Sequence, residues 1–184
     1  MKKRFWQPLW KLEEIEAELG ALEKEGWRLS AIKGLRRFEF VPAKPKEVRY
    51  FYTYLTYNMF SRSLRYSGQM TFLEAKLKEG KYGSTCVSSG NLSFFRIARP
   101  QDLSELRRDR ALVLNQMFRG RALCGLAYLL IFSVFILLSV TLNGKCDVFE
   151  IALLIGLILP MFLYTVYNAI GWQAQRKKIK HKQY

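Results

Sequence analysis

Two long apolar runs near the end of the chain dominate its pattern of hydrophobic and polar positions. Neither Ala122–Leu142 nor Ile151–Ala174 contains a charged residue. At about 1.5 Å per residue, a helix over either run can cross a hydrocarbon core about 30 Å thick. The short segment 143–147 between the runs can do little more than turn the chain. The pattern therefore predicts a two-helix transmembrane hairpin, with helices over 122–142 and 148–174 joined by an extracytoplasmic turn.

The pattern before this hairpin predicts a cytoplasmic α+β domain over residues 1–99. Leucine and isoleucine recur at three- and four-residue steps between Pro8 and Glu25, with glutamates between them, which indicates an amphipathic helix. Gly26 follows as its stop. Alternating apolar, β-branched and aromatic positions then predict strands at 27–33, 36–41 and 48–57, the last being the strongest.

A similar order of elements returns in the second half of the domain. A helix is predicted over 71–79, followed by a hairpin with strands at 82–87 and 92–98. Lys24-Glu25-Gly26 is echoed by Lys78-Glu79-Gly80. We interpret the domain as two diverged helix–hairpin units, the alternative being a chance likeness. The short links between strands imply an antiparallel sheet with both helices covering one face.

The positions of the basic residues predict the orientation in the membrane. The chain has a net charge of +15, yet the turn of the hairpin contains only one basic residue, Lys145. The positive-inside rule therefore places both ends in the cytoplasm, with 175–184 as a basic cytoplasmic tail. Basic residues beside a membrane gain about 1 kcal/mol each near anionic lipid. The expected lipid-facing anchors are Arg119, Arg121, Arg176, Lys177 and Lys178.

Residues 100–121 form a helical linker between the domain and the first predicted span. Leucines alternate with arginines along it. The segment therefore either lies on the lipid surface as an amphipathic helix or continues the first span into the cytoplasm. We favour the continuous helix, which would join the folded domain to the membrane without a break.

The order of elements in the domain resembles that of a known family. The resemblance rests on an aromatic start, an acidic helix ending in a Gly-Trp pair, a short aromatic strand and a proline-containing link to the next strand. These features are Phe5-Trp6, Lys24-Glu25-Gly26-Trp27, Arg37-Phe38-Glu39-Phe40 and Arg49-Tyr50. They are similar to the DUF2812 family, which implies a bacterial inner-membrane protein with an α+β domain followed by membrane spans. That family has no established activity, so no catalytic or ligand residue carries over.

The sequence contains few residues suited to catalysis. Its single histidine, His181, lies in the basic tail, which excludes a Ser/His/Asp or Cys/His arrangement within the domain. No glycine-rich phosphate loop is present, and the three cysteines lack metal or redox spacing. The glutamates of the first helix fall at spacings typical of solvated positions. We therefore expect no enzyme activity, no cofactor and no metal, and we identify no small-molecule substrate.

One cluster of side chains suggests a partner-binding surface. Alternation along the strongest strand places three tyrosines on one face, and arginines flank them. Such a ladder can grip a peptide or stack on bases, and the favoured alternative is ordinary cross-strand packing. The candidate residues are Arg36, Arg37, Arg49, Tyr50, Tyr52 and Tyr54.

These features favour a non-enzymatic inner-membrane protein whose cytoplasmic domain binds a protein partner, with a regulatory role, or associates with itself. One alternative is a membrane-anchored nucleic-acid-binding regulator, although the sequence lacks an RRM-type motif. Another is a small accessory subunit of a transport complex. Within the domain, Trp27 follows the capping glycine, and we expect it to fold back between helix and sheet as the main apolar anchor of the first unit.

Overall fold

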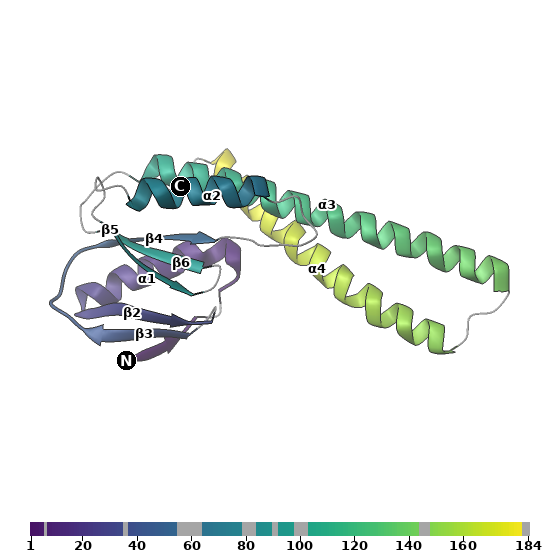
Figure 1. Cartoon of the computed structure of the whole chain (residues 1–184), viewed down its shortest axis with the longest axis horizontal. Coiled ribbons are helices and arrows are strands. Elements are labelled where there is room, and N and C mark those ends of the chain that lie inside the picture. Colours follow the sequence, from purple (N-terminus) through teal and green to yellow (C-terminus); the bar gives the residue numbers. More distant parts are fainter. Residues whose placement is uncertain are drawn as a thin grey trace. The chain divides into compact units, whose positions relative to one another are not determined.

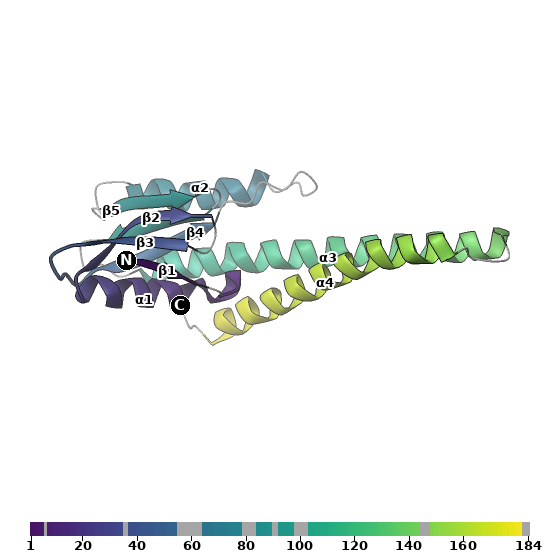
Figure 2. The same cartoon turned by 90° about the horizontal axis from the view of Figure 1, so that it is seen from below.

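The chain divides into two compact units, Met1–Val113 and Leu114–Gln183. The computed structural model describes residues 1–5, 7–34, 37–54, 64–78, 84–89, 92–97, 103–143 and 148–181. The first unit contains the strands and two of the helices, and the second consists of long helical segments (Figures 1 and 2). The α+β class predicted for the first part of the chain is confirmed.

The first unit repeats the order strand–helix–strand–strand. Its first half contains β1 (Lys2–Arg4), a short 3-10 turn (Leu9–Lys11), α1 (Leu12–Lys24), β2 (Trp27–Lys33) and β3 (Arg37–Pro42). Its second half contains β4 (Arg49–Tyr54), α2 (Leu64–Lys78), β5 (Ser84–Ser89) and β6 (Leu92–Ile97). The predicted helix–hairpin units are therefore present, and a strand precedes each of them. The sequence predicted β4, at 48–57, but did not predict β1.

The strands form two three-stranded antiparallel sheets, whereas the sequence predicted one sheet. Their orders are β1-β3-β2 and β4-β6-β5, so in each half the first strand pairs with the third. The sheets come together where β2 lies beside β5. Helix α1 contacts β2 of its own sheet and β4 of the other, while α2 contacts β4 and β5. The expectation that both helices cover one face of a single sheet is therefore wrong, because α1 bridges the two sheets (Figure 1).

The centre of the first unit lies between the third strands of the two halves. Phe38 of β3 and Phe94 of β6 are fully buried, and their rings meet edge to face with centroids 5.5 Å apart. Helix α1 contributes its predicted apolar stripe to the same core, through Leu12, Ile15, Leu19 and Leu22. The equivalent strands of the two repeats thus share one hydrophobic core.

Helix α1 ends as the sequence predicted. Gly26 has a φ of +91°, which a residue with a side chain rarely adopts. A Cβ atom at this position would also lie 3.1 Å from the main-chain oxygen of Ala43. The glycine therefore both stops the helix and admits the close approach of the link that leads to β4.

Trp27 does not fill the role that the sequence suggested. It is half-buried, whereas Phe38 and Phe40 of β3 are buried. The reason lies in the strand register, because Trp27 is the first residue of β2 and pairs with Pro42, the last residue of β3. One side of the indole therefore remains open at the end of the sheet, and the phenylalanines form the main anchor.

The second unit is an antiparallel pair of helices. Helix α3 (Ser104–Asn143) begins in the first unit and continues through the second, and α4 (Val148–Lys180) returns beside it (Figure 2). The linker predicted over 100–121 therefore continues into the first apolar run as one helix from Ser104. Within the described residues, α3 is long and apolar enough over Ser104–Ser139 to cross a membrane.

The two helices come close to each other at two glycines. A Cβ atom at Gly125 would lie 2.1 Å from Oγ1 of Thr165, and one at Gly171 would lie 2.8 Å from the ring of Phe118. From Phe118 onward, the least exposed positions of α3 recur at alternating steps of four and three residues, which is the spacing of a coiled-coil seam. They are Phe118, Ala122, Gly125, Leu129, Phe132 and Ile136.

Candidate functional site

The tyrosines predicted to form a binding ladder lie mostly inside the first unit. Tyr50 and Tyr52 are buried, with 2% and 0% of their surfaces exposed, and Tyr54 is half-buried. Neither Tyr50 nor Tyr52 is accessible to a partner in this structure. Their burial favours core packing, which the sequence had offered as the alternative. Both faces of β4 are covered, since Phe51 and Thr53 are fully buried as well.

The candidate arginines are more accessible than the tyrosines. Arg37 is exposed on β3 and Arg49 is exposed at the start of β4. They belong to different sheets, so the structure does not bring them into one cluster. Arg36 lies outside the described residues. The predicted surface therefore separates into a buried tyrosine strand and basic residues on two distinct sheets.

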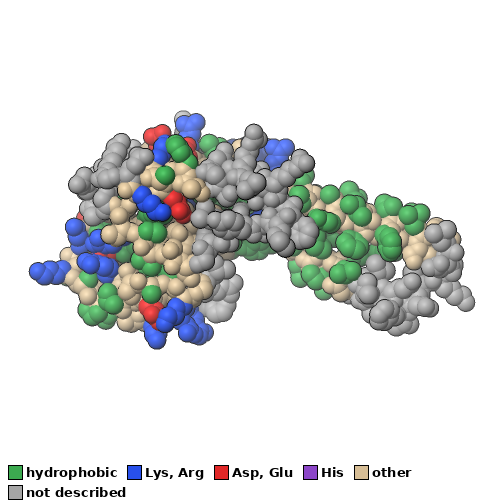
Figure 3. Space-filling view, viewed as in Figure 1, with side chains coloured by type: hydrophobic (Ala, Val, Ile, Leu, Met, Phe, Trp, Pro, Cys, Tyr) green, Lys and Arg blue, Asp and Glu red, His purple; other side chains and the backbone are tan. Residues whose placement is uncertain are grey.

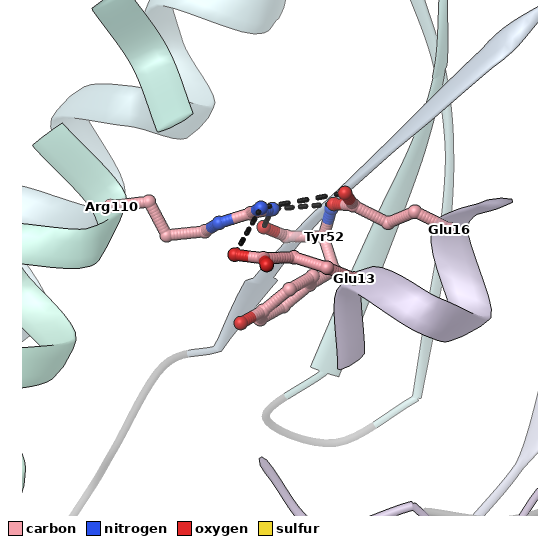
Figure 4. A network of polar contacts seen from close by, with 4 residues as sticks. All are labelled: Glu13, Glu16, Tyr52 and Arg110. Carbon is pink, nitrogen blue, oxygen red and sulfur yellow. Dashed lines mark hydrogen bonds and ion pairs between the residues drawn. The ribbon is translucent and has the colours of Figure 1, made fainter. Parts of the chain in front are cut away.

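The main-chain groups of Tyr52 are instead occupied by two charged side chains (Figure 4). Its N–H donates to Oε1 of Glu16 over 2.6 Å, and its carbonyl oxygen accepts from Nη1 of Arg110 over 3.1 Å. Glu16 comes from α1 and Arg110 from α3. Since β4 pairs only with β6 among the described strands, these side chains occupy the free edge where another strand would otherwise pair.

Glu16 and Arg110 also pair with each other. Nη1 of Arg110 donates to Oε1 of Glu16, and Nη2 lies 3.4 Å from Oε2 of Glu16 and from Oε1 of Glu13. The guanidinium carbon lies 4.2 Å from the ring centroid of Phe51 and 4.0 Å from that of Tyr52. The pair is thus held by fork-like hydrogen bonds and by contact with two aromatic rings.

Burial controls the protonation of this site. Removal from water raises the pKa of the Glu16 carboxyl group above its ordinary value, while the charge and hydrogen bonds of Arg110 oppose the rise. Burial also raises the pKa of the Tyr52 hydroxyl, so the ring stays neutral across the physiological range. The geometry thus places one arginine charge against a carboxylate in a site closed to solvent.

A second buried carboxylate, Glu23, lies one heptad further along α1. It accepts a hydrogen bond from the Tyr50 hydroxyl over 2.6 Å and one from Nε of Arg96 over 2.6 Å, and it pairs with Arg28. Burial alone would raise the pKa of Glu23. The hydrogen bonds from Arg96 and Tyr50 and the neighbouring positive charges outweigh burial, so the pKa lies below its ordinary value.

A third glutamate completes the pattern around β4. Glu74 of α2 accepts a hydrogen bond from the hydroxyl of Thr53. Tyr50, Tyr52 and Thr53 of one strand are therefore each bonded to a buried glutamate, from either α1 or α2. The expectation that the α1 glutamates are solvated is wrong for Glu16 and Glu23. Each of the three carboxylates is engaged in internal contacts.

The sequence pattern did not indicate that Arg110 belongs to this arrangement. It had appeared only as one of several arginines along the helical linker, and its fully buried guanidinium is 94 residues from Glu16 in the chain. One local signal was present. Glu16 and Glu23 are seven residues apart and border the apolar stripe of α1, so a helix that buries a wide face buries both.

The second unit presents a different surface, because large apolar side chains are exposed along both helices (Figure 3). On α3 they include Leu130, Ile131, Phe135 and Leu137, each more than 60% exposed. On α4, whose side chains are described from Gly156 onward, they include Leu159, Phe162 and Leu163. A monomeric protein in water rarely exposes so continuous an apolar surface.

The predicted lipid anchors lie toward one end of this apolar surface. Arg119, Arg176 and Lys177 are exposed, and Arg121 and Lys178 are half-buried. The contact between Phe118 and Gly171 places the basic segments of α3 and α4 at the same end of the helix pair. The five basic residues that the sequence proposed therefore lie on segments at the same end of the helix pair.

No group of three or more histidine, cysteine or acidic side chains suited to a metal ion occurs within the described part of the chain. Comparison with known proteins adds no identification, since no family model, curated protein or solved structure matches the chain. The resemblance to the DUF2812 family stays a prediction.

Proposed function

We propose that this protein is a non-enzymatic component of the inner membrane, anchored by α3 and α4. Its α+β domain lies in the cytoplasm, binds a protein partner and has a regulatory role. The observation that carries the proposal is the exposed apolar surface of the helix pair. Only 11% of the most apolar stretch of 18 residues in α3 is buried, whereas the core helix of a soluble protein is mostly buried. A hydrocarbon environment would remove this surface from water.

The orientation follows from the basic residues at one end of the pair. Arg119 and Arg121 on α3 and Arg176 and Lys177 on α4 belong to segments at the same end of the helix pair, beyond the exposed leucines and phenylalanines. Positively charged segments remain on the cytoplasmic side and interact with anionic lipid. Both chain ends would thus lie in the cytoplasm, with the turn between α3 and α4 outside.

The partner-binding role is supported by the way the domain uses its charges. Its buried glutamates are engaged in internal bonds to Tyr50, Tyr52 and Thr53, as expected of groups that stabilise a fold. Exposed basic side chains such as Arg4 and Arg37 would contact another molecule from the first sheet. A nucleic-acid-binding regulator is the alternative favoured by that positive charge, and an accessory subunit of a transport complex is another.

Membrane insertion is tested by extraction and by cysteine labelling of the full chain. We expect the protein to stay in the membrane fraction after alkaline carbonate treatment. In single-cysteine variants, Cys146 in the predicted turn should react with an impermeant maleimide on intact cells. Cys86, which is exposed on β5, should react only after permeabilisation. Release by carbonate would contradict the anchor, and labelling of Cys86 on intact cells would contradict the orientation.

The partner is tested by purification from detergent-solubilised membranes followed by mass spectrometry. Recovery of one regulatory protein in stoichiometric amount would support the proposal. Recovery of a transporter core would favour the accessory-subunit alternative. A salt-sensitive shift of nucleic acid by the full chain in detergent would favour the nucleic-acid-binding alternative, because the entropy gained by releasing counterions from phosphates falls as the salt concentration rises.

A further inference from the structure

The exposed face of the sheet β1-β3-β2 presents a row of basic residues. Arg4 of β1 lies directly opposite Arg37 of β3, and Arg37 lies directly opposite Lys33 of β2. All three side chains are exposed. Residues in direct register across antiparallel strands share one face, with Cβ atoms about 5 Å apart. The row therefore brings three positive charges together across the whole width of the sheet.

The fold provides little internal compensation for this row. Glu39 lies in the neighbouring row, where it pairs with Lys33 over 3.1 Å and with Lys2 over 3.7 Å. Among the described residues, no carboxylate lies within ion-pair distance of Arg4 or Arg37. Like charges directly opposite each other destabilise a sheet. Such an arrangement is expected where the charges meet an anionic partner.

The opposite face of this sheet fixes the row in place. Phe38 and Phe40 of β3 and Ile32 of β2 point away from the charges and are buried in the core. Of the large apolar side chains on these strands, only Val41 is exposed on the charged face. The described part of the face thus offers positive charge on a flat surface, without exposed aromatic rings on which bases could stack.

We propose that this face binds the anionic headgroups of the membrane in which the chain is anchored. The inference rests on the proposed membrane anchor, because insertion of α3, which begins in the first unit, would hold the domain near lipid. Tethering makes the encounter intramolecular, so modest attraction per residue is sufficient. Arg4, Lys33 and Arg37 form a flat array of positive charge. Such an array is better suited to a layer of phosphate groups than to a single ligand that binds in a buried site.

The test uses the full chain in nanodiscs of neutral lipid or of neutral lipid mixed with phosphatidylglycerol. A single cysteine at Val41→Cys, with Cys86, Cys124 and Cys146 changed to serine, carries an environment-sensitive fluorophore on the charged face. Spin-labelled headgroups quench it when the face lies on lipid. We expect stronger quenching in the anionic nanodiscs, and we expect about 1 M salt to remove the difference, since charges are then screened within about 3 Å.

Two charge-matched variants identify the surface responsible. The variant Arg4→Gln/Lys33→Gln/Arg37→Gln should lose the quenching that depends on anionic lipid. The control Lys11→Gln/Lys44→Gln/Lys46→Gln removes three exposed positive charges elsewhere in the domain and should retain it. Equal loss in both variants would overturn the assignment to this face.

Two further outcomes separate this inference from its alternatives. A response of the fluorophore to single-stranded RNA in neutral nanodiscs, with none to anionic lipid, would overturn it in favour of nucleic acid. Insertion into the nanodiscs without lipid-dependent quenching would overturn this inference alone. Failure of the chain to insert into nanodiscs of either composition would overturn the membrane anchor as well.

Discussion

Glu16 and Arg110 are 94 residues apart in the chain, and together they occupy both main-chain groups of Tyr52 on the free edge of β4. Glu16 accepts the N–H and Arg110 donates to the carbonyl oxygen. The pair thus provides the main-chain hydrogen bonds of one edge residue, which a neighbouring strand would provide along the whole edge. It also joins α1 and the beginning of α3 to the same strand.

Loss of Arg110 should strongly destabilise the first unit. Arg110→Met leaves the Glu16 carboxylate buried without its partner and the carbonyl oxygen of Tyr52 without a donor. We expect the free energy of unfolding to fall by about 3–5 kcal/mol, which is typical of breaking a buried ion pair. Denaturant titration of the full chain in detergent, followed by near-ultraviolet circular dichroism, measures it. A loss below about 1 kcal/mol would mean that the pair contributes little.

The interaction between the two residues is separable from their individual roles. Glu16→Gln keeps an oxygen that can accept the N–H of Tyr52 but removes the charge that Arg110 faces. The double variant Glu16→Gln/Arg110→Met should therefore lose less free energy than the sum of the single variants. A coupling of about 0.5–3 kcal/mol is expected for contacting residues. Strict additivity would show that they act independently.

Glu23 should make stability depend on pH in the acidic range. Its pKa lies below the ordinary value in the folded protein, because the bonds from Arg96 and Tyr50 and the nearby positive charges outweigh burial. A carboxyl group with a lowered folded pKa contributes stability above its unfolded pKa of about 4.3, and that contribution is lost as the pH falls through the folded value.

The variant Glu23→Gln tests this dependence by denaturant titration at several pH values. It should be less stable than the natural protein at pH 7, and the difference should shrink as the pH falls below about 4. Glu14→Gln is the control, since Glu14 is exposed on the same helix. A difference between Glu23→Gln and the natural protein that stays constant down to pH 2 would contradict the linkage.

The local elements of this fold were predictable because local signals determine them. The apolar stripe of α1, the positive φ of Gly26 and the bounds of β2 at 27–33 all follow from residues close together in the sequence. The repeat of the elements was also visible in the spacing of the glycines. The division into two sheets was not, because it depends on which strand edges meet, and strand pattern alone does not specify that.

The candidate site was harder to predict for two physical reasons. Alternation placed Tyr50 and Tyr52 on one face of β4 but could not show that both faces of the strand are covered. A charged residue such as Arg110 is usually exposed, and only its contact with Glu16, far away in the chain, explains its burial. The sequence pattern therefore favoured cross-strand packing of the tyrosines, which their burial supports, but it gave no sign of the buried polar network around Tyr52.

The core of the first unit should depend on Phe38 more than on Trp27. Phe38→Ala removes a fully buried ring that contacts Phe5 and Phe94, and we expect a loss of about 3–5 kcal/mol in the free energy of unfolding. Trp27→Ala removes a half-buried side chain at the end of β2 and should cost about 1–2 kcal/mol. The same denaturant titration ranks them. A larger cost for Trp27→Ala would restore it as the main anchor.

The packing of α3 against α4 should depend on Gly125. A methyl group there would place its carbon 2.1 Å from Oγ1 of Thr165 and 3.1 Å from Cβ of Thr165. Gly125→Ala must therefore either move the helices apart or rotate Thr165 and break the bond from its hydroxyl to the carbonyl oxygen of Met161. We expect a lower melting temperature for the helix pair in detergent micelles, measured by circular dichroism at 222 nm. Adding Thr165→Ala should restore part of the loss, because it removes the hydroxyl that the new methyl group meets.

Gly156 of α4 is the matched control for this prediction. A Cβ atom at Gly156 meets nothing within 4 Å among the described residues, so Gly156→Ala changes the same residue type in open space. It should leave the melting temperature unchanged or raise it, since alanine favours a helix by about 1 kcal/mol over glycine. If Gly125→Ala has the same effect on the melting temperature as Gly156→Ala, the helices do not approach as closely as the contact between Gly125 and Thr165 requires. The close packing of α3 against α4 would then be wrong.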